Sequence, residues 1–571
     1  MTRILSKATK VEIKKLKKQN NYVHELYRWF PVKDTKLFIE LYRRIFDNLD
    51  LTNSLNRARV RGNSNKEVYA SLLSKYSQLP NETVKDEKLI LNLAKDFLAG
   101  APIWKSPLLQ YNVGSATNIA SNVLYAISQE VNVYNINDGL AGNALAAEKV
   151  VCRILSLLAG VDPDKSAGIF TFGGTGTNLY AIKVAITKAV PQSKKLGLRG
   201  KIKIAITEDS HFSHMTSLNW LGIGEENAIV MQANRDRTTN ISRAENEIKS
   251  AIENDFLVPA IIVNGGTTYD NAIDNINKFV EMRNKLVKKY ELRYVPHVHV
   301  DSVIGWSFLV FRDYDFDRNE LDIESNTLKI LNIQAKKAAA IAMADSWGVD
   351  FHKGIGSSPI PCSMVIMNNS DSFATLLQQN EDGSNLHQLA QEFSHINPVS
   401  YTLETSRPGG AALAGLTTIF TLGVKGLQAH LANLVQMARL TRVLAHSDAN
   451  FNIVNTDSLG FVTMLQLIPI SLQGSSLVNK QLEDNSPKMA KFIENLNKYN
   501  EDFFSFDKKD RIHKNQGVEY SFSKGYCSTP SGIKISAIKL YPTSPLITPE
   551  HIEEAINTLI TSKDNFDKQI Q

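Results

Sequence analysis

The sequence predicts an α/β protein in which a largely parallel sheet is covered by helices on both faces. Three observations lead to this class. Before about residue 100 the apolar residues recur only with helical spacing, from about residue 145 short apolar runs alternate with helical patterns, and beyond residue 428 the two are mixed. Alternation of strands and helices indicates a parallel sheet, because parallel neighbours need a crossover connection.

Composition agrees with a large globular protein kept in a reducing compartment. The 571 residues are 43% hydrophobic and 21% charged, which suits several linked domains with a sizeable core. The three cysteines, Cys152, Cys362 and Cys527, are far apart and odd in number, so they predict neither a disulfide framework nor a zinc site. We therefore expect a cytoplasmic protein without a metal.

The net charge does not point to nucleic acid. The formal charge is +6, and residues 1–20, with seven basic residues and one acidic residue, account for all of it. Basicity in one short arm is typical of a solvated or dimer-wrapping helix, with an anionic-surface anchor as the rarer alternative. No run of 18 apolar residues occurs, so we expect a soluble protein that binds neither nucleic acid nor membrane.

The chain divides into three expected parts. Residues 1–100 are expected to be helical, because Leu37, Phe38, Leu41, Tyr42 and Ile45 share one helical face. Such faces outside the αβ core need burial, so this part is expected to pack on a second copy of the chain. Residues 101–427 carry the predicted sheet, and residues 428–571 form a smaller αβ domain.

The individual elements follow from the same periodicities. In the central part we expect strands at 169–172, 202–207, 260–264 and 298–300, and helices at 144–159, 178–190, 273–290 and 410–427. In the last part we expect strands at 451–455, 460–467 and 533–540 and a helix from Pro549.

Polar residues that follow strands are the candidates for chemistry, because ligands bind at the carboxyl ends of parallel strands. Gly173, Gly174 and Thr175 join a strand to a helix, where glycines let the backbone approach an anion and the helix N-terminus attracts phosphate. A structural turn is the alternative, since the Walker lysine and the spacing of a dinucleotide fingerprint are both missing.

Three further positions follow the same logic. Asp301 ends an apolar strand, and a buried carboxylate there needs a cation, either from the protein or from a protonated ring nitrogen of a ligand, unless it only caps a helix. Lys353, beside His352 in a turn flanked by glycine, suits a Schiff base or an ordinary surface loop. His211 also follows a strand, where a lone histidine is usually structural.

In combination these residues match one cofactor. Pyridoxal 5'-phosphate needs a phosphate cup, a partner that stacks on its ring, an anion at its ring nitrogen and a Schiff-base lysine. The glycine turn, His211, Asp301 and Lys353 supply these features in a consistent order along the chain.

Six segments then resemble the group II pyridoxal-phosphate-dependent amino-acid decarboxylases, a fold-type I family. In order along residues 100–430 they are GGTGTNLYA, DSHFSH, GGTTYDNAID, HVHVDSVIGW, ADSWGVDFHKGIG and ETSRPGGAALA. The length, the insertion between Asp301 and Lys353, and the segments PIWKSPLLQYNVGS and YTLETSRPGGA are most similar to the long bacterial tyrosine decarboxylases. The resemblance implies a mostly parallel seven-stranded sheet and a homodimer with the site at its interface.

The resemblance also implies roles for the residues around the cofactor. Lys353 would bond to the cofactor covalently, Asp301 would pair with its ring nitrogen, and His211 would stack on its ring. Gly174 and Thr175 would hold the phosphate.

Other matching positions have less defined roles. Thr268 would lie near the cofactor, and His352 would contact the phosphate or the covalent linkage, whereas His214 is expected to be a neighbour without a role. Ser302 and Val303 depart from the two alanines usual in the family, and Val303 would crowd the ring.

The expected reaction is decarboxylation of an L-amino acid to an amine and CO2. The substrate would be aromatic, such as tyrosine, or acidic, such as glutamate or aspartate. A proton donor is expected on a mobile loop within 376–401, with His395 and Tyr401 as candidates. The alternatives are a carbon–carbon lyase of the sphingosine-phosphate lyase type, favoured slightly by the segment 406–409 (Ser-Arg-Pro-Gly), and a non-catalytic paralogue.

Substrate choice is expected to involve Lys105. The bacterial tyrosine decarboxylases that the chain resembles have a histidine at this position, which reaches the substrate side chain. A lysine there favours an anionic substrate, because a buried, unpaired ammonium is costly. Pairing with a protein carboxylate or exposure to solvent is the ordinary alternative.

Overall fold

The computed structural model describes residues 36–570 apart from 63, 84–85, 378–397, 512–513 and 515. It divides into two compact units, Met1–Ile103 and Trp104–Gln571. The basic arm of residues 1–20 and the candidate proton donor His395 lie outside the described residues.

The described part of the first unit is helical, as predicted. Its elements are α2 (Lys36–Asn48), η2 (Leu51–Asn56), α3 (Lys66–Tyr76) and α4 (Lys88–Leu98). Helix α2 packs on α4, and Leu49, Val60 and Ile103 form a small apolar cluster. No residue of α2, α3 or α4 is fully buried in the single chain, so their apolar side chains are half-buried or exposed.

A seven-stranded sheet forms the centre of the second unit and confirms the predicted fold class. In spatial order its strands are β2 (Ala167–Thr171), β8 (Ser363–Met367), β7 (Ser346–Asp350), β6 (His297–Asp301), β5 (Ala260–Asn264), β3 (Ile204–Thr207) and β4 (Ala228–Met231). Only β8 runs antiparallel to its neighbours. The carboxyl ends of β3, β5, β6 and β7 therefore meet at one edge, where the candidate site residues follow them.

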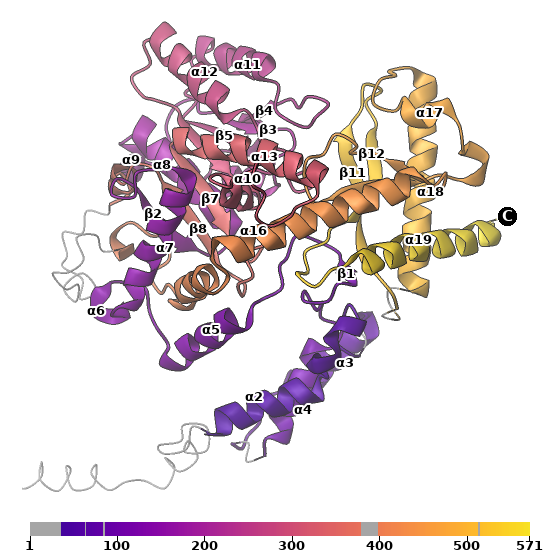
Figure 1. Cartoon of the computed structure of the whole chain (residues 1–571). Helices are drawn as coiled ribbons and strands as arrows, with labels where there is room; N and C mark the ends of the chain where they lie inside the picture. The colour runs from indigo at the N-terminus through magenta and orange to yellow at the C-terminus, as the bar shows by residue number, and fades with distance from the viewer. Residues whose placement is uncertain are drawn as a thin grey trace, which may run out of the picture. The chain divides into compact units, whose positions relative to one another are not determined.

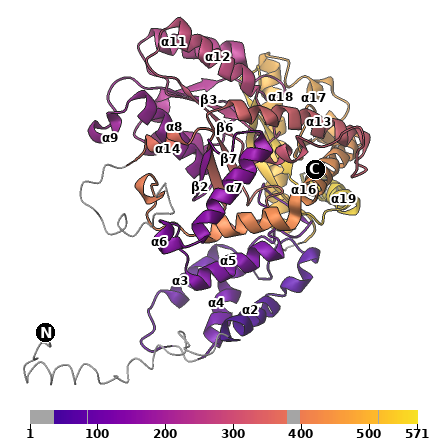
Figure 2. The ribbon, with the colours of Figure 1, turned by 60° about the vertical axis from the view of Figure 1, so that its left-hand side comes forward.

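Apolar side chains cover both faces of this sheet. On β5, Ile261 and Val263 belong to one core cluster, whereas Ala260 and Ile262 belong to another. The first cluster includes side chains of α7 (Ala144–Ala159), α11 (Ile241–Glu253) and α12 (Ile276–Lys289), and the second includes side chains of α8 (Gly174–Ala189) and α10 (Ser213–Trp220). Figure 2 shows α11 and α12 side by side. Burial on both faces explains why the strands are nearly continuous apolar runs.

Further helices and 3-10 turns lie between residues 119 and 400. They are α5 (Ile119–Val131), α6 (Asp138–Ala141), α9 (Ser193–Leu196), η3 (Glu225–Asn227), η4 (Gly305–Phe311), α13 (Ser325–Ala339), η5 (Ala340–Met343), α14 (Asp371–Ala374) and η6 (Pro398–Ser400).

A second sheet of five strands follows in the C-terminal part. Its order is β1 (Leu109–Gln110), β11 (Glu519–Ser528), β12 (Lys534–Leu540), β10 (Thr463–Leu467) and β9 (Phe451–Ile453). Its helices are η7 (Ile470–Leu472), α17 (Ser476–Asn479), α18 (Pro487–Asp510) and α19 (Pro549–Ile570). Because β1 precedes the large sheet in sequence but pairs with β11, the segment after residue 104 links this sheet to the centre of the unit.

Helix α16 (Gly410–His446) joins the two sheets, as Figure 1 shows. It contacts α5 and α7 as well as β9 and α19, and it breaks at Gly423, which has φ 59° and ψ 179°. Among the described residues it is the one helix long and apolar enough to cross a membrane. That property is weak support for a membrane span, because core helices of soluble proteins share it.

Candidate active site

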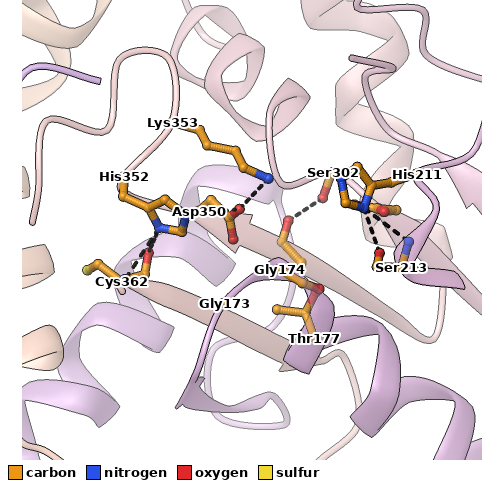
Figure 3. Close-up of polar contacts among 12 residues, drawn as sticks. Gly173, Gly174, Thr177, His211, Ser213, Ser302, Asp350, His352, Lys353 and Cys362 are labelled. Atoms are coloured by element: carbon orange, nitrogen blue, oxygen red, sulfur yellow. Dashed lines mark hydrogen bonds and ion pairs between the residues drawn. The ribbon is translucent and has the colours of Figure 1, made fainter. Parts of the chain in front are cut away.

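The lysine that the sequence singled out lies just beyond β7 and forms an ion pair. Lys353 Nζ lies 2.7 Å from Asp350 Oδ2, and the Asp350 side chain is fully buried. Figure 3 shows the Lys353 side chain pointing toward Asp350. His352 Nε2 lies 3.7 Å from the same oxygen, and His352 Nδ1 contacts the backbone of Cys362. Lysine and histidine therefore share one buried carboxylate.

Backbone pairing fixes the loop that carries Lys353. Gly354 donates to Val113 O at 3.0 Å, and Ser115 donates to His352 O at 3.1 Å. Between them Gly114 forms a β-bridge with Lys353, and a Cβ at Gly114 would lie 2.9 Å from the ring of Trp104. The segment that begins at Trp104 therefore runs past the candidate site.

The glycine turn between β2 and α8 approaches the same carboxylate. A Cβ at Gly174 would lie 3.0 Å from Asp350 Oδ2 and 3.2 Å from Val303 Cγ1, so a side chain here would push these neighbours aside. Helix α8 starts at Gly174, and the backbone amides of Gly174 and Thr175, in the first turn, donate to no other backbone group in the described residues. Their free N–H groups and the helix dipole suit a phosphate.

Asp301 ends β6 and is held by two donors on one oxygen. His214 Nε2 lies 2.9 Å and Asn178 Nδ2 lies 3.1 Å from Asp301 Oδ2, whereas Oδ1 is buried without a hydrogen-bond partner in the described residues. Burial alone would raise the pKa of Asp301, but the hydrogen bond from His214 and the nearby charge of Lys353 outweigh it and hold the pKa well below its usual range. Asp301 is therefore an anion with one unused acceptor.

His211 is half-buried and lies two residues before α10. Its Nδ1 lies 2.8 Å from Ser213 Oγ, as Figure 3 shows. Burial lowers its pKa, although the charge of Asp301 opposes this shift. The ring is therefore neutral at neutral pH, which suits stacking on a flat ligand.

The remaining predicted residues lie at different distances from this centre. Thr268 is half-buried just beyond β5, and the two residues that depart from the family's alanines, Ser302 and Val303, are buried, with Ser302 Oγ donating to Gly348 O at 2.7 Å. Tyr401 packs against Phe373 in a separate apolar cluster on the β2 and β8 side, and burial raises its pKa. Its hydroxyl therefore does not lie among the groups around Asp301.

Lys105 is exposed in the single chain. Its backbone oxygen accepts a hydrogen bond from Ser544 Oγ at 2.8 Å, and no carboxylate in the described residues forms an ion pair with its side chain. The sequence left open a role in the substrate pocket, a pair with a protein carboxylate and exposure to solvent. The single chain shows exposure to solvent.

The residues present fit pyridoxal 5'-phosphate. The unused oxygen of Asp301 suits a protonated ring nitrogen, the amides at the start of α8 suit the phosphate, and the amine of Lys353 lies at the same edge of the sheet. Comparison with known proteins agrees. Residues 72–465 match the family model described as "Pyridoxal-dependent decarboxylase conserved domain". The chain belongs to this family.

The chain is similar to curated relatives that are named as decarboxylases of different amino acids. It is 26% identical over 306 residues to L-2,4-diaminobutyrate decarboxylase of Rhizobium meliloti (strain 1021), covering 51% of each chain. It is 25% identical over 229 residues to acidic amino acid decarboxylase GADL1 of Xenopus tropicalis, covering 40% of this chain and 39% of the relative. The matches thus span about half the length of these curated relatives or less.

Solved structures show the same fold. Mouse CSAD in its apo form superposes with a TM-score of 0.72 at 17% identity, over 92% of this chain and 99% of that one. Oryza sativa TDC with PLP and tryptamine gives 0.74 at 13% identity, over 94% and 99%. At these identities the likeness establishes the fold-type I architecture alone.

Two residues near the site were missed from the sequence. His214 was treated as a neighbour of His211 without a role, yet it contacts Asp301. Lys539 on β12 was not considered, because nothing in a C-terminal strand marks it as close to a site that the other strands build. The sequence signal available for His214 was its place three residues after His211, although His211 itself precedes α10, which begins at Ser213.

Proposed function

We propose that this decarboxylase converts an L-amino acid to the corresponding amine and CO2 with pyridoxal 5'-phosphate. The observation that carries the proposal is the buried Asp301 carboxylate, with one oxygen clamped and the other unused, at the same sheet edge as the Lys353 amine. The named relatives are decarboxylases of different amino acids, so the proposal names the class of substrate, an L-amino acid, and not one member of the class.

When bound, the cofactor supplies an aldehyde that bonds to amines and a ring that takes up the electron pair released with CO2. The chain's residues create the conditions for this. Asp301 holds a proton on the ring nitrogen, which makes the ring a stronger electron acceptor, and the amides at the start of α8 orient the phosphate. Lys353 would provide the amine that holds the cofactor, and its ion pair with Asp350 keeps this amine in place.

The reaction is tested with the purified full chain. Loaded with pyridoxal 5'-phosphate, it should show an absorbance band above 400 nm. Borohydride should remove this band and leave the cofactor permanently attached to Lys353 as a label. Amine and CO2 release from each of the twenty amino acids, 2,4-diaminobutyrate and cysteine sulfinate then identifies the substrate. A labelled protein that releases a carbon fragment other than CO2 would favour the lyase alternative, and an unlabelled protein would favour the non-catalytic one.

A buried cation supports binding of a substrate carboxylate. Lys539 Nζ donates to Asn112 Oδ1 at 3.0 Å and lies over the rings of Tyr269 and Tyr541 at 5.4 and 5.6 Å. No carboxylate in the described residues forms an ion pair with it. Asn112 directly precedes Val113, which pairs with the Lys353 loop. This buried ammonium has no carboxylate partner and contacts the segment that pairs with the Lys353 loop, so it is a suitable partner for an anionic group of the substrate.

The Ser-Arg-Pro-Gly segment does not favour a phospho-amine substrate. The Arg407 guanidinium is buried, pairs with Glu148 and donates to the backbone oxygens of Asn135 and Phe170. These contacts fix the segment that leads into α16, and the charge of Arg407 is already paired with Glu148. The single feature that favoured the lyase alternative therefore has a structural explanation.

We also propose a cytoplasmic homodimer that needs no membrane. Its support is a row of apolar residues on α5, Ile119, Val123, Ile127 and Val131, which are 48–79% exposed in the single chain. Such a face at i, i+4 spacing requires a partner, and the unburied helices of the N-terminal unit give the same indication. Three buried free thiols suit a reducing compartment.

A further inference from the structure

His214 forms a specific contact that its position next to His211 does not require. Its side chain is completely buried at the start of α10, and Nε2 lies 2.9 Å from Asp301 Oδ2. Asn178 Nδ2 contacts the same oxygen at 3.1 Å from α8. Two helices on one side of the sheet thus hold one oxygen of a carboxylate whose other oxygen is unused.

The hydrogen-bonding partners of His214 show which ring nitrogen carries the shared hydrogen. Nδ1 is buried without a partner in the described residues, and a hydrogen there would be left without an acceptor, which is costly. A hydrogen on Nε2 satisfies the contact with Asp301. The Nε2–H group therefore holds Asp301 Oδ2 in place.

The second donor, Asn178, is oriented by a longer chain of contacts. Asn178 Oδ1 accepts from His299 Nε2 at 3.1 Å, and His299 Nδ1 lies 2.8 Å from Ser346 Oγ. Burial lowers the pKa of His299 to about 3, so this histidine is neutral. A chain of neutral groups therefore orients Asn178.

We propose that His214 is a positioning residue that fixes the Asp301 carboxylate so that Oδ1 faces the ring nitrogen of the cofactor. The inference rests on the proposed role of Asp301 and adds to it a residue that acts through Asp301. A rotated carboxylate would still be negative, but it would present its oxygen at a poorer angle, and the ring nitrogen would hold its proton less well. A histidine that only fills space would need its ring volume but not its Nε2 hydrogen.

Three substitutions separate these roles. His214→Gln keeps a side-chain N–H that reaches about as far as Nε2, His214→Phe keeps the ring but removes the donor, and His214→Asn stays polar but is too short to reach Asp301. The apo-protein is titrated with pyridoxal 5'-phosphate to obtain Kd. The protein is then loaded with cofactor labelled with 15N at the ring, and the 15N chemical shift reports ring protonation. His430→Phe, at a buried histidine that contacts Thr543 O, is the matched control.

We expect His214→Phe and His214→Asn to raise Kd at least about tenfold and to move the 15N shift toward the unprotonated value, while His214→Gln and His430→Phe stay near wild type. If the first two variants keep wild-type Kd and shift, or if His214→Gln is as impaired as His214→Phe, the positioning role is wrong. Should His214→Phe not fold, the comparison of Gln with Asn decides in the same way. Asp301→Asn is measured in parallel. If this variant keeps the wild-type Kd and 15N shift, the proposed role of Asp301 itself is wrong. If Asp301→Asn changes them and the His214 variants do not, only the positioning role of His214 is wrong.

Discussion

Lys353 and Asp350 form an ion pair of 2.7 Å in which the aspartate is fully buried. Apart from this pair, neither oxygen of Asp350 accepts a hydrogen bond in the described residues. The glycine turn between β2 and α8 lies against this pair, since a Cβ at Gly174 would lie 3.0 Å from Asp350 Oδ2. Lys353 is thus both the anchor for the cofactor and the neutralising partner of a buried charge, and its removal should affect both functions.

Replacing Lys353 by alanine should abolish turnover and covalent labelling. It should also destabilise the fold by about 3 kcal/mol, because breaking a buried pair leaves an uncompensated charge. In the double variant Lys353→Ala/Asp350→Asn the stability should recover while activity stays absent. Denaturant unfolding and amine release measure the two effects, and a Lys353→Ala variant with wild-type turnover would contradict the proposed chemistry.

Asp301→Asn should leave the protein folded and able to bind cofactor but should slow kcat by on the order of a hundredfold or more, about 2.7 kcal/mol in the barrier. The neutral amide cannot hold a proton on the ring nitrogen, so the electron acceptor is weakened. The measurement is single-turnover CO2 release at saturating cofactor. Near-wild-type kcat in this variant would remove the electron-acceptor role of Asp301.

The sequence was sufficient for residues whose signal is local. Asp301, His211, Lys353 and Gly174 follow strands or open a helix, and a parallel sheet brings such positions to one edge whatever the loops between them do. The segment of β7, Ser346–Asp350, was not recognised as a strand because glycine and aspartate interrupt its apolar pattern. Tertiary burial between β6 and β8 nevertheless makes it one.

Contacts between residues that lie far apart along the chain have no comparable local signal in the sequence. Lys539 is an ordinary lysine in a C-terminal strand. Asn112 lies beside it because β1 pairs with β11 and because Tyr541 N donates to Gln110 O. Exposure of Lys105 to solvent was one of the ordinary alternatives to a role in the substrate pocket. Long-range packing of this kind depends on the register of whole sheets, which residue spacing along one segment does not specify.

Lys539→Met should raise KM at least about tenfold, about 1.4 kcal/mol, with a smaller effect on kcat, because a cation for the substrate carboxylate is lost. Lys539→Arg should preserve KM. Lys563→Met is the matched control: that lysine is also buried, but it pairs with Asp567 at 2.7 Å, so its loss should lower stability without changing KM. Equal KM values for wild type and Lys539→Met would exclude Lys539 from substrate binding.

Substrate binding should weaken as pH rises through about 8. Burial lowers the pKa of Lys539 to about 8, below its ordinary 10.5, so the side chain is an ammonium below this pH and a neutral amine above it. The carboxylate partner is therefore lost on the alkaline side. A KM profile from pH 6 to 10 should rise above about 8 in wild type and stay flat over the same range in Lys539→Arg, because arginine keeps its charge.

Charged substitutions on α5 should break the proposed homodimer. Val123→Asp and Ile127→Asp each place a carboxylate in the exposed apolar row, where desolvation in an interface is unfavourable. Sedimentation velocity should show a dimer in wild type and a monomer, with reduced activity, in either variant. Val295→Asp is the control, since Val295 is comparably exposed in a loop outside this row. A fully active wild-type monomer would refute the assembly.

The choice between acidic and aromatic substrates should depend on Lys105. Its side chain is exposed in the single chain, but its segment runs past the Lys353 loop through Gly114, and in the proposed dimer with the site at the interface it would lie beside the substrate. A cation there favours an acidic side chain, and histidine or alanine removes that preference. Lys105→His and Lys105→Ala should therefore shift the ratio of kcat/KM for acidic over aromatic substrates at least about tenfold, about 1.4 kcal/mol, toward the aromatic ones. Because an exposed charge is screened, the shift should persist at 0.5 M salt only if the dimer buries Lys105. An unchanged substrate profile in both variants would leave Lys105 as a solvated surface residue and place the selectivity in other side chains of the pocket.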